Sequence, residues 1–433
     1  MANGMNAGMS VAGALDQVLA RIFPRGVPVR FDFWDGSSLG PTDGPPGRVM
    51  VKSPDALRRL AWAPGELGVA RAFVVGDIDF EGDIFTLLRQ LRDGRSVSIP
   101  STTELIGPTV DAARRLGLVG PPPRPPEVEI RLSPWRSGSV HSKTRDEKAV
   151  THHYDVGNDF YRLVLGPSMT YSCARFTHED ASLEEAQAAK HDLVCRKLGL
   201  HERPGARLLD VGCGWGSMAM HAARTYEAQV VGVTLSPAQA ELARRRVEDE
   251  GLSKLVEIRI EDYRDLGGER FDAISSIGMF EHVGKENMAA YFETLASLLA
   301  PRGRLLNHAI SKPGGSRMSG RTFINRYVFP DGELIDVSEV VAGMQRAGFE
   351  VRDVESLREH YAKTLRHWVA NLEDRFDDAV ALAGAQRARV WRLYMAGSAN
   401  SFEENSIAVH QVLGVRTDDA GESGMPLTRA GWD

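Results

Sequence analysis

The chain has 433 residues, of which 42% are hydrophobic and 25% are charged, so a wholly disordered protein is excluded. No mainly apolar run reaches the roughly 20 residues that a bilayer-spanning helix needs. The net charge of −6 argues against broad nucleic-acid binding, which uses a basic surface. Three cysteines cannot form a disulfide framework, and the first residues lack the pattern of a secretory signal. We therefore expect a cytoplasmic enzyme that binds no nucleic acid.

Residues 1–118 are expected to form a small α+β domain. Hydrophobic periodicity predicts an amphipathic helix over Val11–Ile22 and strands over Val27–Trp34 and Arg48–Lys52. A further helix is predicted over Pro54–Leu60, because proline is favoured at the first position of a helix and a serine precedes it. This domain is a candidate for lipid handling or dimerisation.

A proline-rich run within residues 119–145 predicts a stiff, extended linker after this domain. In residues 146–416 the pattern changes to strands that alternate with helices, which is typical of a doubly wound parallel sheet. Residues 417–433 are polar and contain glycine, so we expect a loose tail. The expected fold class is therefore α/β, with a doubly wound Rossmann-like domain preceded by a smaller α+β domain.

A glycine-rich turn follows the first strand predicted in the larger domain, Leu208–Val211. Gly212, Gly214 and Gly216 allow the backbone to turn tightly and to approach a ligand, and the next helix offers unpaired N–H groups. The G-x-G-x-G spacing after Asp210 looks like the glycine motif of S-adenosylmethionine (SAM) methyltransferases. We expect Asp210 and these glycines to bind SAM.

Polar residues follow the next strands, which are predicted over Gln229–Val233, Val256–Ile260, Phe271–Ile277 and Arg304–Ala309. The carboxyl ends of parallel strands meet at one edge of a sheet, where ligands bind. After the third strand, a carboxylate could accept the adenine amino group and an aromatic ring could cover the base. These segments extend the expected cofactor site by Thr234, Leu235, Ser236, Gln239, Asp262, Tyr263 and Arg264.

Four segments of the larger domain bring histidine, cysteine, tyrosine and glutamate close to glycine-containing turns: His153–Phe160, Met169–Ala174, Gly278–Gly284 and His308–Ile310. Together they resemble the cyclopropane-fatty-acyl-phospholipid synthase and mycolic acid cyclopropane synthase family of SAM-dependent methyltransferases. The likeness extends over about Val150–Gln411. The N-terminal domain is also similar to the small domain that precedes the catalytic domain in longer members.

The resemblance implies a reaction at the cis double bond of an unsaturated fatty acyl chain in a phospholipid. The alkene attacks the methyl group of SAM and becomes a carbocation, which a bound bicarbonate ion deprotonates. Tyr171 and Ser172 would contact SAM, and Phe280 and Trp368 are candidate aromatic faces for the cation. By motif correspondence, the bicarbonate would be held by Cys173, Glu281, His308, the backbone of Ile310 and Tyr361.

Considered alone, each residue of this catalytic set also has a structural interpretation. A lone cysteine is more often a small buried residue than a reactive one. Tyr361, Leu365 and Trp368 have helical spacing and would form a core stripe. The pair His152-His153 suggests a metal, but adjacent side chains point apart, so we expect no metal site.

The product depends on how the carbocation loses its proton. Loss from the added methyl group closes a cyclopropane, whereas a preceding hydride shift gives a methylene or methyl branch. Many relatives carry a cysteine where this chain has Ser398, and this departure, with Glu403 and Asn405, is more similar to the 10-methyl (tuberculostearic acid type) subgroup. We expect the 10-methyl type, with a cyclopropane product as the alternative. A reductase partner and a homo-oligomer stay open.

Residues 301–330 contain six basic side chains and no acid. Arg317 and Arg321 lie in a glycine-rich segment that could contact phospholipid phosphates. On this basis we expect transient, peripheral contact with the inner face of the membrane. The alternative is a solvated loop whose basic residues pair with acids elsewhere.

Two other functions remain as alternatives. A small-amine N-methyltransferase of the same fold would need neither bicarbonate nor the cluster of Cys173, His308 and Tyr361. A non-catalytic lipid-binding protein would not need an intact glycine loop, so this loop and Glu281 argue against it.

Overall fold

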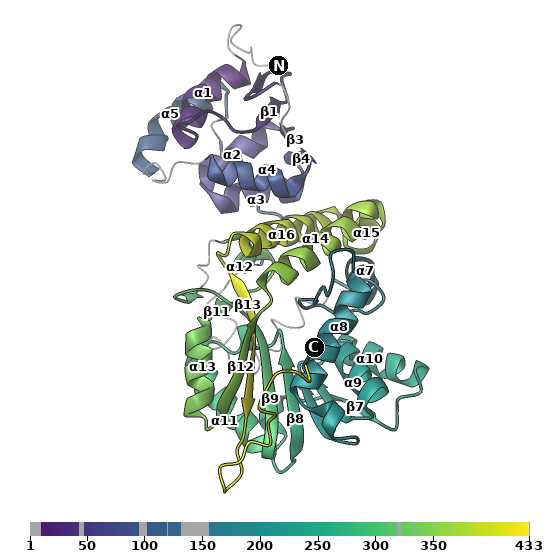
Figure 1. Cartoon of the computed structure of the whole chain (residues 1–433). Helices are drawn as coiled ribbons and strands as arrows, with labels where there is room; N and C mark the ends of the chain where they lie inside the picture. The colour runs from purple at the N-terminus through teal and green to yellow at the C-terminus, as the bar shows by residue number, and fades with distance from the viewer. Residues whose placement is uncertain are drawn as a thin grey trace. The chain divides into compact units, whose positions relative to one another are not determined.

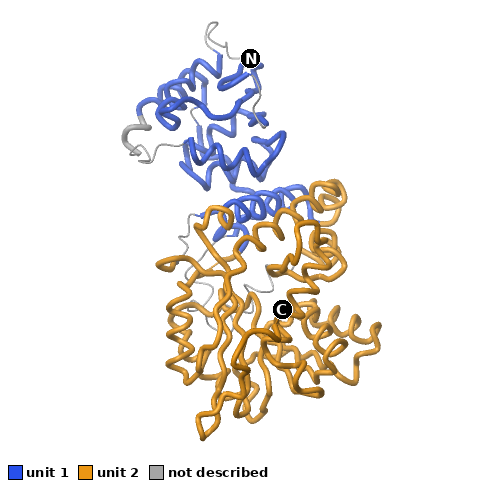
Figure 2. The backbone as a smooth tube through the Cα atoms, in the orientation of Figure 1, with its two compact units in different colours: residues 1–131, 320–328, 383–400 blue, residues 132–319, 329–382, 401–433 orange. Residues whose placement is uncertain are grey.

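The computed structural model describes residues 10–42, 47–94, 102–118, 120–130, 156–317, 322–330 and 332–432. The chain divides into two compact units (Figure 2). Unit 1 comprises residues 1–131, 320–328 and 383–400, and unit 2 comprises residues 132–319, 329–382 and 401–433. The expected succession of an N-terminal and a catalytic domain is therefore modified, because two later segments belong to the first unit.

The N-terminal part of unit 1 consists of α1 (Val11–Ile22), β1 (Arg30–Phe33), β2 (Ser38–Leu39), β3 (Gly47–Val51), α2 (Pro54–Trp62), α3 (Glu66–Val75), β4 (Ile78–Gly82), α4 (Ile84–Asp93) and α5 (Thr102–Arg115). The strands form one sheet in the order β2-β1-β3-β4, in which only β1 and β3 are parallel. Ser53 caps α2 by accepting a hydrogen bond from Asp55 N, and Pro54 is the first helical residue, as predicted.

Residues 120–130, the described part of the expected linker, pack within unit 1. The carboxylate of Glu129 is buried, and its two oxygens accept hydrogen bonds from Arg71 at 2.7 and 2.6 Å. The hydroxyl of Tyr327 donates to the same carboxylate at 2.9 Å. A buried carboxylate needs such partners, so the end of this proline-rich stretch is held in place by contacts within unit 1.

Residues 383–400 belong to unit 1 because of contacts with distant parts of the sequence. Arg389, on α16 (Ala385–Glu403), donates a hydrogen bond of 2.6 Å to the carbonyl oxygen of Phe73, which is 316 positions away. The same guanidinium forms an ion pair with Asp79 at 3.1 Å. These contacts explain why a helix from the C-terminal third of the chain completes the first unit.

Unit 2 is built on a seven-stranded sheet (Figure 1). Its strands are β5 (Arg207–Val211), β6 (Gln229–Thr234), β7 (Val256–Ile260), β8 (Phe271–Ile277), β9 (Leu299–Ser311), β12 (Glu350–Ser356) and β13 (Ala408–Val415). The order is β12-β13-β9-β8-β5-β6-β7, with β5 to β9 parallel and β13 antiparallel to both of its neighbours. The predicted Rossmann-like α/β fold is confirmed, and β12 and β13 add to the five predicted strands.

Helices cover both faces of this sheet. They are α8 (Leu183–Lys197), α9 (Ser217–Tyr226) and α10 (Pro237–Asp249) on one face, and α11 (Met288–Leu298) and α13 (Val337–Arg346) on the other. Two further helices, α7 (Asn158–Leu165) and α14 (Arg358–Asp374), pack against each other. One core joins Leu193, Ala219 and Ala243 from α8, α9 and α10. A second core joins Phe292 and Met344 from α11 and α13. Two apolar faces covered by helices are the expected result of a doubly wound sheet.

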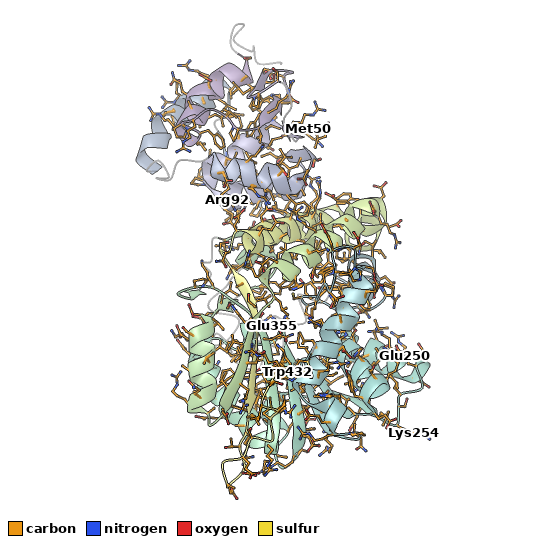
Figure 3. All side chains as sticks on the ribbon, in the orientation of Figure 1. Met50, Arg92, Glu250, Lys254, Glu355 and Trp432 are labelled. Atoms are coloured by element: carbon orange, nitrogen blue, oxygen red, sulfur yellow. The ribbon has the colours of Figure 1, made fainter. Side chains whose placement is uncertain are left out.

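Residues 417–432 pack on unit 2 and do not form the expected loose tail. Arg302 Nε and Asp418 form an ion pair at 2.7 Å, and Arg429 pairs with Asp353 at 2.8 Å. Trp432 is buried (Figure 3). Asp418 and Arg429 therefore hold this segment on unit 2 through ion pairs, and the buried ring of Trp432 holds its end.

Candidate active site

The loop between β5 and α9 lies at the carboxyl end of the parallel strands. Gly212, Gly214 and Gly216 have φ values of 74°, 55° and 80°, a left-handed conformation that favours glycine. A Cβ on Gly214 would meet only Gln239 Nε2, at 3.9 Å, so the space in front of this residue is open. A Cβ on Gly216 would meet Ala243 Cβ at 3.3 Å, so Gly216 permits close packing of α10.

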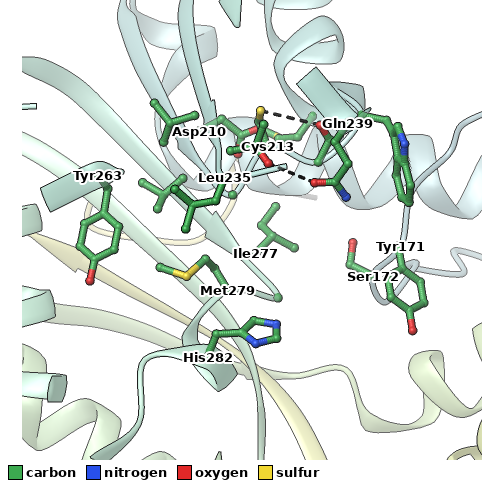
Figure 4. A pocket seen from close by; sticks show the side chains of 18 of the residues that line it. Tyr171, Ser172, Asp210, Cys213, Leu235, Gln239, Tyr263, Ile277, Met279 and His282 are labelled. Carbon is green, nitrogen blue, oxygen red and sulfur yellow. Dashed lines mark hydrogen bonds between the residues drawn. The ribbon is translucent and has the colours of Figure 1, made fainter. Parts of the chain in front are cut away.

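A cavity lies at this loop, within unit 2 (Figure 4). Most of the residues predicted to bind the cofactor line it: Tyr171, Ser172, Asp210, Gly212, Gly214, Thr234, Leu235, Gln239, Asp262, Tyr263 and Arg264. Gly216 and Ser236 do not line it. The Ser236 side chain instead caps α10 by accepting a hydrogen bond from Gln239 N at 3.3 Å. The structure thus brings together residues that follow β5, β6 and β7.

Two carboxylates of the cavity have different surroundings. Asp262 accepts a hydrogen bond from Arg264 Nε at 2.8 Å. Asp210 Oδ1 accepts from Ser275 Oγ at 2.7 Å, whereas its Oδ2 is buried and has no partner in the described part of the chain. Burial raises the pKa of Asp210 to about 6. Asp210 therefore retains an unused acceptor oxygen beside the cavity.

Lys190 and His191 on α8 also line the cavity, and no motif in the sequence indicated them. Lys190 is 1% exposed, and its Nζ donates to Ser172 Oγ at 2.9 Å. Burial lowers the pKa of Lys190 to about 8. Gln187, three residues earlier on the same helix, donates to the carbonyl oxygen of Ser172 at 2.9 Å. This i, i+3 pair of long polar side chains is the one sequence signal that could have found Lys190.

Glu281 lies in a short 3-10 helix, Phe280–His282, directly after β8. Its Oε1 accepts a hydrogen bond from the backbone N–H of Ile310 at 2.7 Å. Its Oε2 is buried and has no partner among the described residues. Burial of the carboxyl group raises the pKa of Glu281 to about 7. Two of the predicted catalytic residues are therefore in direct contact, and one carboxyl oxygen is left unused.

His308 on β9 lies opposite Gln411 on β13. The distance between Gln411 Nε2 and His308 Nδ1 is 3.3 Å, and because an amide nitrogen donates, Nδ1 accepts and the proton of the neutral ring is on Nε2. His308 Nε2 is buried without a partner in the described chain. Burial, together with the charge of Lys190, holds the pKa of His308 well below its usual range. The neutral imidazole therefore has one free N–H donor.

Cys173 and Tyr361 are connected through the start of α14. The thiol of Cys173 is fully buried and contacts the carbonyl oxygens of Ala174 at 3.2 Å and Leu357 at 3.5 Å. Leu357 O also accepts from Tyr361 N at 3.0 Å. Burial raises the pKa of Cys173, an effect that the charge of Lys190 partly offsets. The thiol is therefore neutral and is a donor to the backbone.

Aromatic rings extend from the cavity to Tyr361. The ring of Trp368 lies 5.4 Å from that of Tyr171 and 6.0 Å from that of Tyr361. Phe280 is the other ring that was predicted to face the cation. It packs instead in the second core, where its ring centre lies 5.4 Å from that of Tyr291 and 5.5 Å from that of Phe292. Of the two candidate rings, only Trp368 stands between cofactor-site and catalytic-site tyrosines.

None of the predicted catalytic residues is among those that line the cavity. Ser172 and His282, the sequence neighbours of Cys173 and Glu281, do line it. The charge of Lys190 lowers the pKa of His308 and partly offsets the rise in the pKa of Cys173. The pair His152-His153 lies outside the described residues. Within the described ranges, no three His, Cys, Asp or Glu side chains gather as metal ligands.

Comparison with known proteins agrees with this geometry. The family model "Mycolic acid cyclopropane synthetase" matches residues 141–412. A probable fatty acid methyltransferase of Mycobacterium tuberculosis is 45% identical, over 92% of this chain and 94% of its own length. The cyclopropane-fatty-acyl-phospholipid synthase of Escherichia coli is 32% identical, over 85% of this chain and 87% of its own.

Among solved structures, a mycolic acid cyclopropane synthase complexed with SAH and CTAB superposes with a TM-score of 0.58 and 37% identity. The match covers 62% of this chain and 98% of that chain. The glycine loop, the cavity at the strand ends and these matches lead to one conclusion: the chain belongs to the cyclopropane synthase family of SAM-dependent methyltransferases.

Proposed function

We propose that the protein methylates an unsaturated fatty acyl chain of a phospholipid at its cis double bond and produces a methylene or 10-methyl branch. The observation that carries this proposal is that Glu281 and His308, both buried, each keep one polar atom without a partner among the described residues. His282, the sequence neighbour of Glu281, lines the SAM cavity. Relatives of similar length are named for fatty acid methylation and for cyclopropane formation on phospholipid acyl chains. A small-amine N-methyltransferase, the alternative, would not need bicarbonate for its rate.

The reaction balances in two steps. The π electrons of the alkene form a C–C bond to the methyl group of SAM while the C–S bond breaks and sulfur keeps its electron pair. The substrate cation then loses a proton: directly from the added methyl group, which closes a cyclopropane, or after a 1,2-hydride shift, which leaves a methylene branch. A methyl branch requires a further reduction by a separate reductase.

The residues present fit a bound bicarbonate, which would supply the base for this proton. Glu281 Oε2 can accept a hydrogen bond from the bicarbonate hydroxyl, and His308 Nε2–H can donate to a bicarbonate oxygen, since both atoms lack partners among described residues. The hydroxyl of Tyr361 is a further candidate donor. With a pKa near 7, Glu281 can take up the proton and release it to solvent. The backbone N–H of Ile310 acts indirectly, because it already holds Glu281.

The 10-methyl assignment rests on the departure at Ser398, which lies on α16. Mass spectrometry of fatty acids from cells that express the chain tests both levels of the proposal. We expect monounsaturated fatty acids to gain one CH2 group, with fragments that show a methylene branch, or a methyl branch where a reductase is present. A ring would support the cyclopropane alternative. Unchanged fatty acids, together with methylation of small amines by the purified protein, would contradict the proposal.

Bicarbonate dependence is tested separately with the purified protein. We expect the methylation rate on phospholipid vesicles to fall in buffer that has been depleted of carbon dioxide and to recover when bicarbonate is added. E281Q provides the control, because its residual rate should no longer respond to bicarbonate. A wild-type rate that is independent of bicarbonate would exclude this base.

Contact with the membrane remains part of the proposal. No helix in the described part of the chain is both long and apolar enough to span a bilayer. Of the six basic residues in 301–330, Arg302, Arg304 and Arg326 pair with acids, as the alternative interpretation expected. Within the described residues Lys312 forms no ion pair, and the side chains of Arg317 and Arg321 lie outside them. These three residues are the proposed contacts to lipid phosphates. Reversing the charges of Arg317 and Arg321 should reduce co-sedimentation with anionic vesicles, and unchanged binding would contradict the contact.

A further inference from the structure

Gln411 is a fully buried amide on β13 that contacts the ring of His308 on β9. The two residues lie directly opposite each other, and Gln411 Nε2 is 3.3 Å from His308 Nδ1. On its other side Gln411 is opposite Glu355 on β12, which pairs with Lys197. Residues that are opposite on antiparallel strands have their side chains on the same face of the sheet. His308, Gln411 and Glu355 therefore form a polar row across three neighbouring strands (Figure 1).

Other contacts fix the backbone around His308 but not its ring. The carbonyl oxygen of His308 accepts a hydrogen bond from Gly278 N at 2.9 Å. Two residues later on β9, Ile310 N donates to Glu281. Among the described residues, Gln411 is the one hydrogen-bond partner of the ring, because His308 Nε2 has none. The orientation of the ring and the position of its proton are therefore left to Gln411.

The tautomer of His308 decides whether its free nitrogen can bind an anion. A neutral imidazole has one N–H, and the hydrogen bond at one ring nitrogen decides which of the two carries the proton. A carboxylate beside Nδ1 would accept from an Nδ1–H and leave Nε2 as an acceptor. The amide of Gln411 donates to Nδ1 and leaves the proton on Nε2. Because only a nitrogen that carries a proton can donate to an anion, an amide at position 411 makes His308 suitable for one.

We propose that Gln411 is a positioning residue that holds the neutral ring of His308 with its proton on Nε2 and so makes this atom the donor to bicarbonate. Gln411 acts through His308 and is not itself a ligand of the bicarbonate. The inference rests on the proposed function, because bicarbonate is the proposed base.

The surroundings of His308 keep its ring neutral, as this role requires. Burial holds the pKa of His308 well below its usual range. Three groups act in the same direction: Lys190 and Lys197 on α8 and His410 on β13. A protonated ring would carry an N–H on both nitrogens, and its Nδ1–H would then oppose the amide N–H of Gln411. The neutral ring and the contact with Gln411 therefore support each other.

NMR of protein labelled with ¹⁵N-histidine measures the tautomer directly, without substrate or bicarbonate. A ring nitrogen that carries a proton and one that does not differ widely in ¹⁵N chemical shift, and couplings to the ring hydrogens distinguish Nε2 from Nδ1. H308N assigns the signals of His308 by their loss. We expect a protonated Nε2 and a bare Nδ1. A proton on Nδ1, or on both nitrogens, would overturn the proposal.

Q411M removes the donor and keeps the length of the side chain. The proton should then exchange between the two ring nitrogens of His308, which brings their chemical shifts together. The bicarbonate concentration that gives half of the maximal rate should rise about tenfold, as expected for the loss of one hydrogen bond's support to a charged ligand. The rate at saturating bicarbonate should stay within about threefold of the wild-type rate. An unchanged bicarbonate requirement, or a loss of rate that saturating bicarbonate does not restore, would contradict the role of Gln411.

Ser311 provides the matched control, since it joins the same two strands without a hydrogen bond to His308 in the described chain. Its Oγ lies 2.7 Å from His410 Nδ1. S311A should lower the melting temperature and leave both the tautomer of His308 and the bicarbonate requirement unchanged. An equal rise of the requirement in S311A would show that strand pairing, and not the amide, is responsible. Q411L repeats the test if Q411M does not fold, and the wild-type spectrum needs no substitution at position 411.

Failure of this inference differs from failure of the proposed function. A bicarbonate-dependent wild type whose His308 carries its proton on Nδ1 would reject the role of Gln411 alone. A wild-type rate that is independent of bicarbonate would reject the base itself, whatever the tautomer of His308.

Discussion

Two buried lysines on one helix have opposite surroundings. Lys197 Nζ forms ion pairs with Asp353, at 2.8 Å, and with Glu355. Lys190, two turns earlier on α8, has one hydrogen-bond acceptor within the described ranges, the neutral hydroxyl of Ser172. Hydrophobicity and helix propensity treat the two lysines alike, so only the tertiary structure distinguishes them.

Strand β9 repeats this contrast. Arg304 pairs with Glu202 at 2.8 Å, whereas His308, four residues later, has a buried Nε2 without a partner among described residues. We define the paired region as Lys197, Asp353, Glu355, Arg304 and Glu202, and the unpaired region as Lys190, Asp210, Glu281 and His308. Unpaired buried groups cost stability and shift pKa values, and such groups concentrate where chemistry is performed. The paired region serves the fold, and the unpaired region is available for ligands.

The largest effect should come from removing a proton acceptor in the unpaired region. E281Q should lower kcat by about 10²–10⁴-fold, the usual contribution of a general acid or base. Its melting temperature should not fall, because the amide oxygen can still accept from Ile310 N and a costly buried carboxylate is gone. Lipid mass spectrometry gives the rate and calorimetry the melting temperature. E202Q in the paired region should lower the melting temperature and leave kcat unchanged. If both variants changed kcat and the melting temperature in the same way, the distinction between the paired and the unpaired region would be wrong.

The next effect should be a loss of stability in the paired region. K197M should lower the free energy of unfolding by about 3–5 kcal/mol, because it leaves Asp353 buried without this partner. K190M leaves no ion-paired carboxylate behind, so it should change the free energy of unfolding by less than about 1 kcal/mol. Urea denaturation measures both values. Equal losses would show that Lys190 is as structural as Lys197.

Two carboxyl groups of the unpaired region should make the stability of the fold depend on pH. Burial raises the pKa of Glu281 from 4.5 to about 7 and that of Asp210 from 3.8 to about 6. At a pH between the unfolded and the folded pKa of each group, the folded chain binds more protons than the unfolded chain. The two groups therefore contribute most to the stability of the folded chain below their unfolded pKa values. This stabilisation is lost as the pH rises to about 7. Urea denaturation at several values from roughly pH 5 to pH 7 measures this effect. The free energy of unfolding should fall less with rising pH in E281Q and D210N than in the wild type, and in E202Q it should fall as in the wild type.

The smallest expected effect concerns the hydroxyl beside Lys190. S172A removes one hydrogen bond and should weaken SAM binding about two- to tenfold, with little change in stability. Calorimetric titration measures the affinity. S182A removes the cap of α8 and should lower the melting temperature without changing the affinity. A loss of affinity in S182A equal to that in S172A would mean that the position of the helix, and not the hydroxyl, is responsible.

The parts of the site that the sequence predicts are those with local signals. Gly214 is recognisable because a tight turn between a buried strand and a helix demands glycine. The residues after β6 and β7 follow from the same fold, since parallel strands end at one edge. Glu281 and His308 could be joined only through the family resemblance, because 26 intervening residues contain no local pattern that connects them.

Other features have little or no local signal. Lys190 lies in a helix with several charged residues, and only its i, i+3 spacing from Gln187 distinguishes it from a solvated lysine. Arg389 joins unit 1 through partners more than 300 positions away, so no window of sequence contains the contact. Phe280 beside Glu281 suggests a ring in the active site, but the side chain is buried and its ring packs in the core against Phe292.

The neutral state of Cys173 has a consequence for the durability of the enzyme. The thiol is adjacent in sequence to Ser172, which lines the SAM cavity, and SAM is an alkylating agent. Only a thiolate is a strong nucleophile towards such a methyl group. Because burial keeps the sulfur protonated and its hydrogen is directed to main-chain carbonyl oxygens, the protein is protected from methylating itself between turnovers.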